Sequence, residues 1–370
     1  MLDVVGDVCG IHAQMAASAE LSLGLRVDGI TRSDVNTALW RERSLVKTYG
    51  LRGTLHLLPA REFSLWTAAL RAKVPPREPS RAELDGLPLD RRDELIQAIC
   101  AALEGRERTR DDLEADIARR VGAWATEAAL PAFGGRWPRW QLGLHQAAQQ
   151  GLIVAGPPRG NRVTYVRTED WLGTLEPVDG QTALREVCRR FLAAYGPATH
   201  VEFARWFYTR ASAARELMAS LDLESVEVEG WRAWLPRASA DGLGERVDGL
   251  DERVDGRVEN LDEATLHLVP QFDCYVVGGY PRDRLIPEAA PAPLKRGTAA
   301  PFAVVLIGGT VGGLWQRQRH GAHLDVRIDM FKHASASQRQ AAERQAARVA
   351  AILGLPPSVS FGSVEPRAHL

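Results

Sequence analysis

The sequence predicts a mainly α fold with small β-sheets (α+β), in which three tandem winged helix-turn-helix motifs precede a C-terminal β-barrel-like region. Two observations predict it. A set of helical stretches followed by a short β-ribbon recurs three times along the chain. Near residue 263 the pattern changes to strand-like runs that end in one long helical stretch. A chain of 370 residues has room for several domains, and we place their boundaries at 1–75, 76–176, 177–262 and 263–370.

The first motif begins with an Ala-rich helical run behind Gly10. Thr31 is typical of an N-cap and precedes an amphipathic helix that we expect to reach about Tyr49. Residues 50–59 read as a turn and a short strand, and 60–72 resume helix. Prolines then mark a linker to the second motif.

The second motif has the clearest pattern. Three helices are expected over 90–103, 109–120 and 138–150, followed by a hairpin with strands 152–155 and 163–166. Arg159 and Arg162 lie at the hairpin tip, where they suit contact with a phosphate or the minor groove. The alternative is an ordinary solvated loop.

The third motif repeats this order, and the last region differs. Helices are expected over 181–195, 200–207 and 211–220, with a hairpin over 226–235. Residues 240–263 are acidic and rich in glycine, which favours a long insertion. The C-terminal region is expected to form strands over 265–269, 302–307, 310–316 and 324–328 and a helix over 337–353.

Composition limits the classes of protein. Hydrophobic residues make up 45%, charged residues 25%, and the net charge is -1, which argues against a uniformly basic nucleic-acid binder but leaves room for a local basic face. The four cysteines form no CxxC pair, so neither a structural zinc site nor a disulfide scaffold is indicated. No signal peptide or membrane-spanning run is apparent. We expect a cytoplasmic protein without metal or cofactor.

A His and a Gln, His12 and Gln14, follow Gly10 near the amino terminus. On a regular helix, residues two apart point to nearly opposite sides. The two can serve one site only if the backbone departs from helix, as a break at Gly10 would allow. The plainer interpretation is one surface residue and one buried, satisfied residue.

Two classes of function fit tandem winged helices, a DNA-binding regulator and an enzyme that acts on DNA. The chain has no P-loop, no GxGxxG and no HExxH. The polar, basic stretch with Gln316 and Arg317 could touch a phosphate or simply be a solvated strand end. The opening motif favours the enzyme, because a regulator does not need a His/Gln pair beside a glycine.

The chain resembles the AlkZ/YcaQ-like winged-helix DNA glycosylases over nearly its whole length. The motifs that carry the resemblance are Cys9–Gln14 with Ser18–Leu21, Tyr49–Leu57, Tyr195–Thr199 and Leu268–Tyr275. The His-x-Gln form is similar to the AlkZ branch, whereas many relatives have Gln-x-Gln or Gln-x-Asp. Neutral Gln14 therefore replaces a carboxylate that could orient water.

The resemblance implies a C-shaped molecule around a positively charged channel and a monofunctional glycosylase that removes N7-alkylated purines. It also implies unhooking of interstrand crosslinks of the azinomycin type, in double-stranded DNA. We expect a monomer in which His12 and Gln14 jointly orient a water molecule. The candidate DNA contacts are Arg52, Lys47, Arg159, Arg162, Gln316 and Arg317. For Arg52, a helix cap or a buried ion pair is the alternative.

Overall fold

The computed structural model describes residues 1–80, 86–132, 135–228, 230–239, 266–295 and 302–365. The expected acidic insertion over 240–263 lies outside the described residues. The fold is a mixture of helices with several small sheets. In the described part of the chain, no helix is both long and apolar enough to cross a membrane.

The first unit consists of a helix, a short strand, two further helices and two strands, in that order along the chain. The elements are α1 (Leu2–Asp7), β1 (Ile11–His12), α2 (Ala16–Gly24), α3 (Arg32–Trp40), β2 (Leu45–Tyr49) and β3 (Leu55–Pro59). The two-residue strand β1 pairs antiparallel with β3, which pairs with β2 on its other side, giving the order β1-β3-β2. The short strand therefore joins the first helix to the hairpin of the same unit.

The same order recurs in the second unit. Its elements are α6 (Leu89–Ala102), β4 (Arg108–Thr109), α7 (Arg110–Val121), α8 (Arg139–Gln149), β7 (Ile153–Arg159) and β8 (Arg162–Arg167). The sheet order is again short strand, last strand, first hairpin strand, here β4-β8-β7. A second hairpin, β5 (Ala128–Ala132) and β6 (Gly135–Pro138), is inserted before α8 and was not predicted.

The third unit reduces the short strand to a single bridge. Its elements are α10 (Gly180–Tyr195), α11 (His200–Phe207), α12 (Ala211–Ala219), β9 (Leu223–Val228) and β10 (Trp231–Pro236). Ala198, between α10 and α11, forms an isolated antiparallel bridge to Trp234 of β10. Two more helices connect the units, α4 (Phe63–Ala72), which packs against α10, and α9 (Thr168–Leu172) after the second hairpin.

The C-terminal region is an open sheet, so the expected barrel is wrong. Its strands are β11 (Leu266–Val269), β12 (Val304–Ile307), β13 (Thr310–His320), β14 (His323–Met330) and β15 (Pro357–Phe361), in that order across the sheet. Its helices are α15 (Cys274–Gly278), α16 (Arg282–Leu285), α17 (Ala292–Lys295) and α18 (Ala336–Leu353).

Both faces of this sheet are covered without closure. Val305 of β12 packs in the core formed with α18, whereas its neighbours Val304 and Leu306 pack with residues of α16 and α17. Alternating side chains along a strand point to opposite faces, so helices cover the two faces separately. A sheet whose faces are both buried gains little by closing into a barrel.

The largest error of the sequence prediction within the first unit concerns residues 45–49. We expected helix through Tyr49, but α3 ends at Trp40 and the segment Leu45–Tyr49 is strand β2. Val46, Thr48 and Tyr49 have β-branched or aromatic side chains that suit a pleated, half-buried strand, and β3 supplies a pairing partner. Tertiary pairing therefore overrides the helical continuation.

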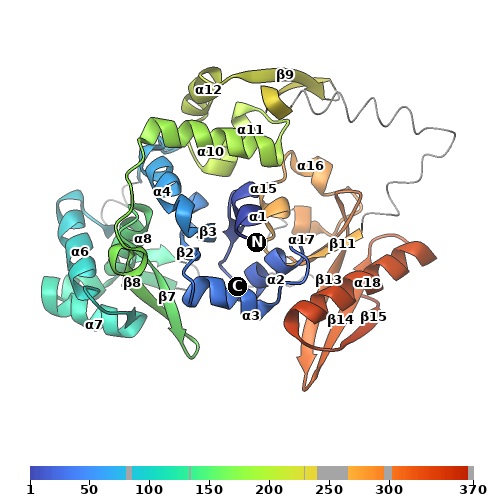
Figure 1. Cartoon of the computed structure of the whole chain (residues 1–370), viewed down its shortest axis with the longest axis horizontal. Coiled ribbons are helices and arrows are strands. Elements are labelled where there is room, and N and C mark those ends of the chain that lie inside the picture. Colours follow the sequence, from blue (N-terminus) through green and yellow to red (C-terminus); the bar gives the residue numbers. More distant parts are fainter. Residues whose placement is uncertain (81–85, 133–134, 229, 240–265, 296–301, 366–370) are drawn as a thin grey trace.

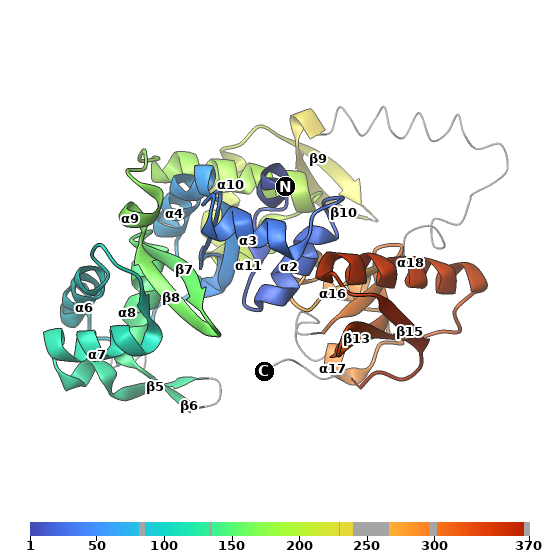
Figure 2. The ribbon, with the colours of Figure 1, turned by 60° about the horizontal axis from the view of Figure 1, so that its bottom comes forward.

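The units lie in a curved arrangement (Figure 1). The α6–α8 unit and the C-terminal sheet occupy opposite ends, and α10–α12 run along one side between them. The elements α1–α3 lie in the middle, and Figure 2 shows the β7–β8 hairpin extending toward them. Leu21 of α2 belongs to the core that α18 forms with the C-terminal sheet, so the amino-terminal unit is packed directly onto the last domain.

Candidate active site

The backbone turns sharply just before His12. Cys9 and Gly10 both have positive φ angles, 60° and 93°. A Cβ on Gly10 would meet Leu58 Cδ2 at 2.8 Å and the Leu57 carbonyl oxygen at 3.2 Å, so only glycine fits the close approach to β3. This turn ends α1 and places His12 in β1, opposite His56 of β3. The backbone around His12 is therefore not helical, as a shared site for His12 and Gln14 would require, and it forms a short strand instead.

The imidazole of His12 is held between two rings. It stacks on Phe272 with 4.9 Å between centroids and 9° between planes, and meets the edge of His56 at 5.2 Å. His12 is 7% exposed, and its buried Nδ1 has no hydrogen-bond partner among the residues that the structure describes. Burial, and secondarily the Arg52 charge, lower the pKa of His12 to about 4. At neutral pH the ring is uncharged, and one nitrogen can accept a proton.

His56 supports this neutral state. Its Nδ1 lies 2.9 Å from the carbonyl oxygen of Thr54, and because a carbonyl only accepts, this nitrogen carries the proton. Burial depresses the pKa of His56 well below its usual value. The residue therefore faces His12 as a second uncharged imidazole.

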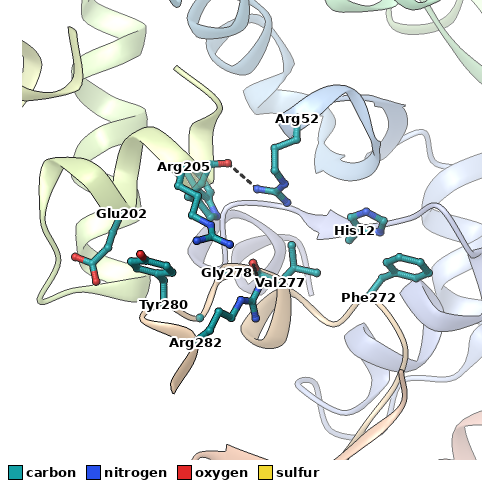
Figure 3. Close-up of a pocket in the computed structure, with 11 residues that line it drawn as sticks. His12, Arg52, Glu202, Arg205, Phe272, Val277, Gly278, Tyr280 and Arg282 are labelled. Carbon is teal, nitrogen blue, oxygen red and sulfur yellow. Dashed lines mark hydrogen bonds between the residues drawn. The ribbon is translucent and has the colours of Figure 1, made fainter. Parts of the chain in front are cut away.

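His12 lines a pocket of about 210 Å³. The walls come from β1, from the β2–β3 turn with Arg52, from α11 and from the segment 272–282 (Figure 3). Three guanidinium groups, those of Arg52, Arg205 and Arg282, point into one region, with Phe272 and Tyr280 as aromatic walls. A neutral imidazole thus faces a cationic space that is large enough for several atoms of a ligand.

Gln14 is placed differently. Ala13 extends the β1 pairing by donating its N–H to the Leu55 carbonyl oxygen at 2.6 Å, and Gln14 follows at the exposed turn into α2. It does not belong to the residues that line the His12 pocket. The structure therefore brings His12, but not Gln14, into the pocket itself.

Comparisons with known proteins all indicate the same protein family. A family model described as "DNA glycosylase AlkZ-like" matches residues 5–352. The chain belongs to the AlkZ-like DNA glycosylase family. A curated protein of Streptomyces sahachiroi named "Interstrand DNA cross-link repair glycosylase" is 28% identical over 365 residues, covering 95% of this chain and 91% of that protein. The solved structure of "Streptomyces sahachiroi DNA glycosylase AlkZ" aligns with a TM-score of 0.76 and 27% identity, over 97% and 93% of the two chains.

In this AlkZ-like glycosylase, Arg52 makes the helix-cap contact that the sequence offered as the alternative, and its contact with DNA stays a prediction. It sits in the β2–β3 turn with a left-handed φ of 56°, and its Nη1 donates to the Trp206 carbonyl oxygen at 2.6 Å, near the end of α11. Burial lowers the pKa of Arg52 to about 10, and Arg282 contributes in the same direction. The side chain caps a helix end and also lines the pocket.

Lys47 lines a second pocket, of about 270 Å³, between α2, α3 and the β7–β8 hairpin. Burial lowers the pKa of Lys47, while the carboxylate of Glu20 opposes the shift. Glu20 also pairs with Arg32 at 2.9 Å and influences the pKa of Arg317, which burial lowers. The Glu20 carboxylate therefore opposes the effect of burial on the pKa of both Lys47 and Arg317, which are far apart in sequence.

Gln316 and Arg317 line a third pocket of about 270 Å³ together with Gln271. Gln271 precedes Phe272, the residue that stacks on His12. The polar end of β13 thus lies near the candidate active site of this glycosylase.

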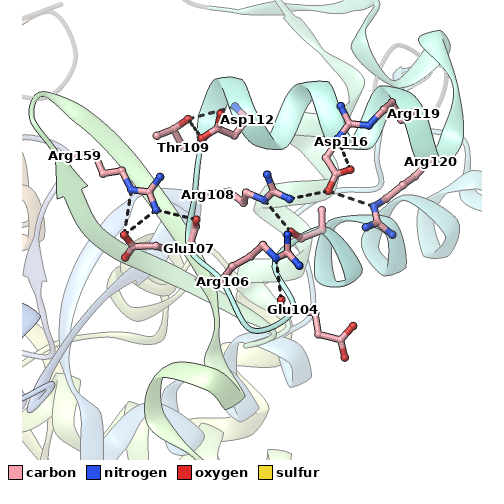
Figure 4. Close-up of polar contacts among 11 residues, drawn as sticks. Glu104, Arg106, Glu107, Arg108, Thr109, Asp112, Asp116, Arg119, Arg120 and Arg159 are labelled. Atoms are coloured by element: carbon pink, nitrogen blue, oxygen red, sulfur yellow. Dashed lines mark hydrogen bonds and ion pairs between the residues drawn. The ribbon is translucent and has the colours of Figure 1, made fainter.

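The hairpin arginines of this glycosylase are ion-paired, and Figure 4 shows the contact of Arg159 with Glu107. Arg159 donates from Nε and Nη2 to Glu107 Oε1 at 3.1 and 3.0 Å. Arg162 lies 3.7 Å from Asp111. Both side chains are more than half exposed, so each guanidinium remains open to solvent. The predicted hairpin tip is correct, and its positive charge is partly balanced by acidic neighbours.

Sequence reasoning missed Arg205 and Arg282 in the pocket of this glycosylase. Arg205 lies in the last turn of α11, and Arg282 begins α16 directly after Pro281. Neither stands in a motif that indicates function. The aromatic residue Phe272 was within a recognised signature, but its stacking on His12 could not be read from it.

Proposed function

We propose that this protein hydrolyses the N-glycosidic bond of N7-alkylated purines in double-stranded DNA, including those held in interstrand crosslinks. The observation that carries the proposal is the neutral, buried His12, whose ring lines a cationic pocket and whose Nδ1 has no hydrogen-bond partner among the described residues. A curated relative named for interstrand cross-link repair supports the crosslink substrate.

The chemistry suits weak catalytic groups. N7-alkylation gives the purine a formal positive charge, so the base leaves without being protonated. The oxygen of water attacks C1′, the bond from C1′ to N9 breaks, and its electron pair neutralises the departing base. His12 positions the water and accepts its proton. We assign Gln14, which lies at the exposed turn outside the pocket, a share in orienting the same water. Such positioned proton transfer contributes about 10²- to 10⁴-fold.

An open site suits a crosslink. A base tied to both strands does not swing freely into a deep pocket, which makes ordinary base flipping difficult. We also propose that the three repeated units are winged helices and that the molecule forms a C-shape around duplex DNA. The shared sheet order of the units supports this proposal. Because the His12 pocket is built from one chain, we propose that the protein acts as a monomer.

The deciding experiment uses a duplex with a single N7-methylguanine. After incubation with the protein, alkaline treatment cleaves any abasic site, and the released base is measured by chromatography. We expect release of N7-methylguanine and strand cleavage only after alkali. Tight duplex binding without release would instead favour the regulator without catalysis. A duplex with one N7-linked crosslink then tests unhooking.

The rate of excision should be nearly independent of pH between 5.5 and 8. Because the pKa of His12 is lowered to about 4, its ring stays neutral across this range and is lost as a base only as the pH approaches 4. An imidazole with the ordinary pKa near 6.5 would lose about tenfold in its neutral form between pH 7.5 and 5.5. Single-turnover release, corrected for spontaneous depurination in buffer, measures the difference. A tenfold fall would contradict the lowered pKa.

Arg162→Ala should reduce the salt dependence of duplex binding. One phosphate contact accounts for a slope of about 0.9 in log affinity against log salt, and Arg162 is held only loosely by Asp111 at 3.7 Å. Fluorescence anisotropy between 50 and 200 mM salt gives the slope. Arg189→Ala, which removes an exposed arginine of α10 that pairs with Glu186, is the matched control. Equal slopes for the two variants would exclude a phosphate contact at Arg162.

A further inference from the structure

Three arginines in the His12 pocket have no acidic partner. Within the described residues, Arg52, Arg205 and Arg282 make no hydrogen bond or ion pair with a carboxylate. By contrast, Arg26 pairs with Asp273 at 2.8 Å and Arg190 pairs with Glu62 at 2.6 Å. The pocket therefore concentrates positive charge that the protein itself does not balance.

Each of the three groups is nevertheless fixed in place. Arg52 donates to the Trp206 carbonyl oxygen at 2.6 Å. Arg282 donates from Nη1 to the Val276 carbonyl oxygen at 2.5 Å and from Nη2 to that of Val277 at 3.3 Å. The Arg205 guanidinium lies 4.6 Å from the centroid of the Tyr280 ring. Carbonyls and a ring hold the planes of these groups without cancelling their charge.

The arrangement is costly without a ligand. Burial lowers the pKa of Arg282, and the nearby Arg205 charge lowers it further. The Nε of Arg282 is also buried and has no hydrogen-bond partner within the described part of the chain. Groups placed against their own repulsion and with an unused buried donor are typical of a site prepared for an anion.

Glu202 is the acidic residue that lines the same pocket. It is buried, and its carboxylate accepts a hydrogen bond from the backbone N–H of Thr199 as part of the capping box that begins α11. Its role in the helix cap explains why it makes no ion pair with the three arginines.

We propose that Arg52, Arg205 and Arg282 bind one phosphodiester of the DNA strand that carries the lesion, next to His12. The inference rests on the proposed function and extends it by naming a DNA group and the residues that hold it. Guanidinium forks match phosphate oxygens, and the pocket of about 210 Å³ also contains the His12 ring. Binding the backbone here fixes the neighbouring sugar, so that C1′ is presented to water held by His12.

The test replaces single phosphates by uncharged methylphosphonates at each of three positions on either side of an N7-methylguanine. With the parental protein we expect a loss of about 10- to 100-fold in kcat/KM at one or two positions, as for removal of a hydrogen bond to a charged group. Arg205→Ala is the main variant, because its exposed side chain can be removed without opening the core. At those positions, the Arg205→Ala variant should release the base at the same slow rate from methylphosphonate DNA as from unsubstituted DNA.

Controls separate this site from a structural effect and from the proposed function. Arg189→Ala should show the same loss of kcat/KM on methylphosphonate DNA as the parental protein. Arg282→Lys, which retains a positive charge, should show part of that loss. The same substitutions are measured in binding to a duplex with a non-hydrolysable abasic analogue, so absence of excision would leave this test intact. A penalty at every position that is identical in the parental protein and in Arg205→Ala would overturn the proposal, as would the absence of any penalty.

Discussion

His12→Ala is expected to lower the rate of N7-methylguanine release by about 10²- to 10⁴-fold while duplex affinity stays the same. The ring of His12 lines the pocket and has an unused buried nitrogen, so its loss removes the group that holds and deprotonates water. It removes no positive charge, because the ring is neutral at the pH of the assay, and phosphate binding is therefore unaffected.

Two further variants sharpen this experiment. His12→Phe retains an aromatic ring for stacking on Phe272 and lacks both nitrogens, so it should be as slow as His12→Ala if chemistry rather than packing is lost. Gln14→Ala should also reduce release and retain binding, since we assign the amide to the same water. Release at the parental rate by both His12→Ala and Gln14→Ala would show that the mechanism is wrong.

Asp273→Ala is expected to destabilise the folded protein by about 3–5 kcal/mol, the usual cost of removing one partner of a buried ion pair. Asp273 has a fully buried side chain and receives two hydrogen bonds of 2.8 Å from Arg26 of α2. It also accepts from the Ser22 hydroxyl and, at 3.0 Å, from the Tyr275 backbone N–H. Without it, the Arg26 charge and the start of α15 both lose their partner.

The urea midpoint measures this prediction, with the exposed pair Asp3–Arg61 as a control. Asp3→Ala should leave the midpoint unchanged, because exposed ion pairs add little. Asp273→Ala should also lower excision more than the loss of folded protein explains, since the adjacent Phe272, at a φ of 60°, supports His12. A midpoint equal to that of the parental protein would contradict the role of this ion pair in joining α2 to the C-terminal region.

Local signals predicted much of the fold. The helices α6, α8, α10 and α18 were expected to within a few residues, because their apolar spacing and end signals are contained in the segments themselves. The strand β1 could not be predicted, since two residues have no periodicity and their partners in β3 lie far along the chain. The five-residue strand β15 was missed because it pairs with β14, from which the long helix α18 separates it in the chain.

The candidate site was predicted in part. His12 and Arg52 were found through motifs, and they line the same pocket. Arg317 and the hairpin tip were placed in their elements correctly, whereas Lys47 was expected in a helix and lies in strand β2. The effect of the Glu20 carboxylate on both Lys47 and Arg317 was not foreseen. Arg205 and Arg282 depend on the packing of α11 against the segment 272–282. Contacts between segments that are far apart in the sequence cannot be predicted from local patterns. The same holds for the hydrogen bond between Arg52 and Trp206, which are 154 positions apart.

The walls of the His12 pocket come from the beginning, the middle and the last third of the chain. A ribosome-bound chain that has not yet exposed Phe272 also lacks Arg282, one of the three cations, even if its first unit has folded. A fragment that ends before residue 263 should likewise retain elements for binding DNA but no complete pocket. The ability to cut a glycosidic bond therefore arises late in synthesis, and partial unfolding of the C-terminal region would remove it before the remaining units unfold.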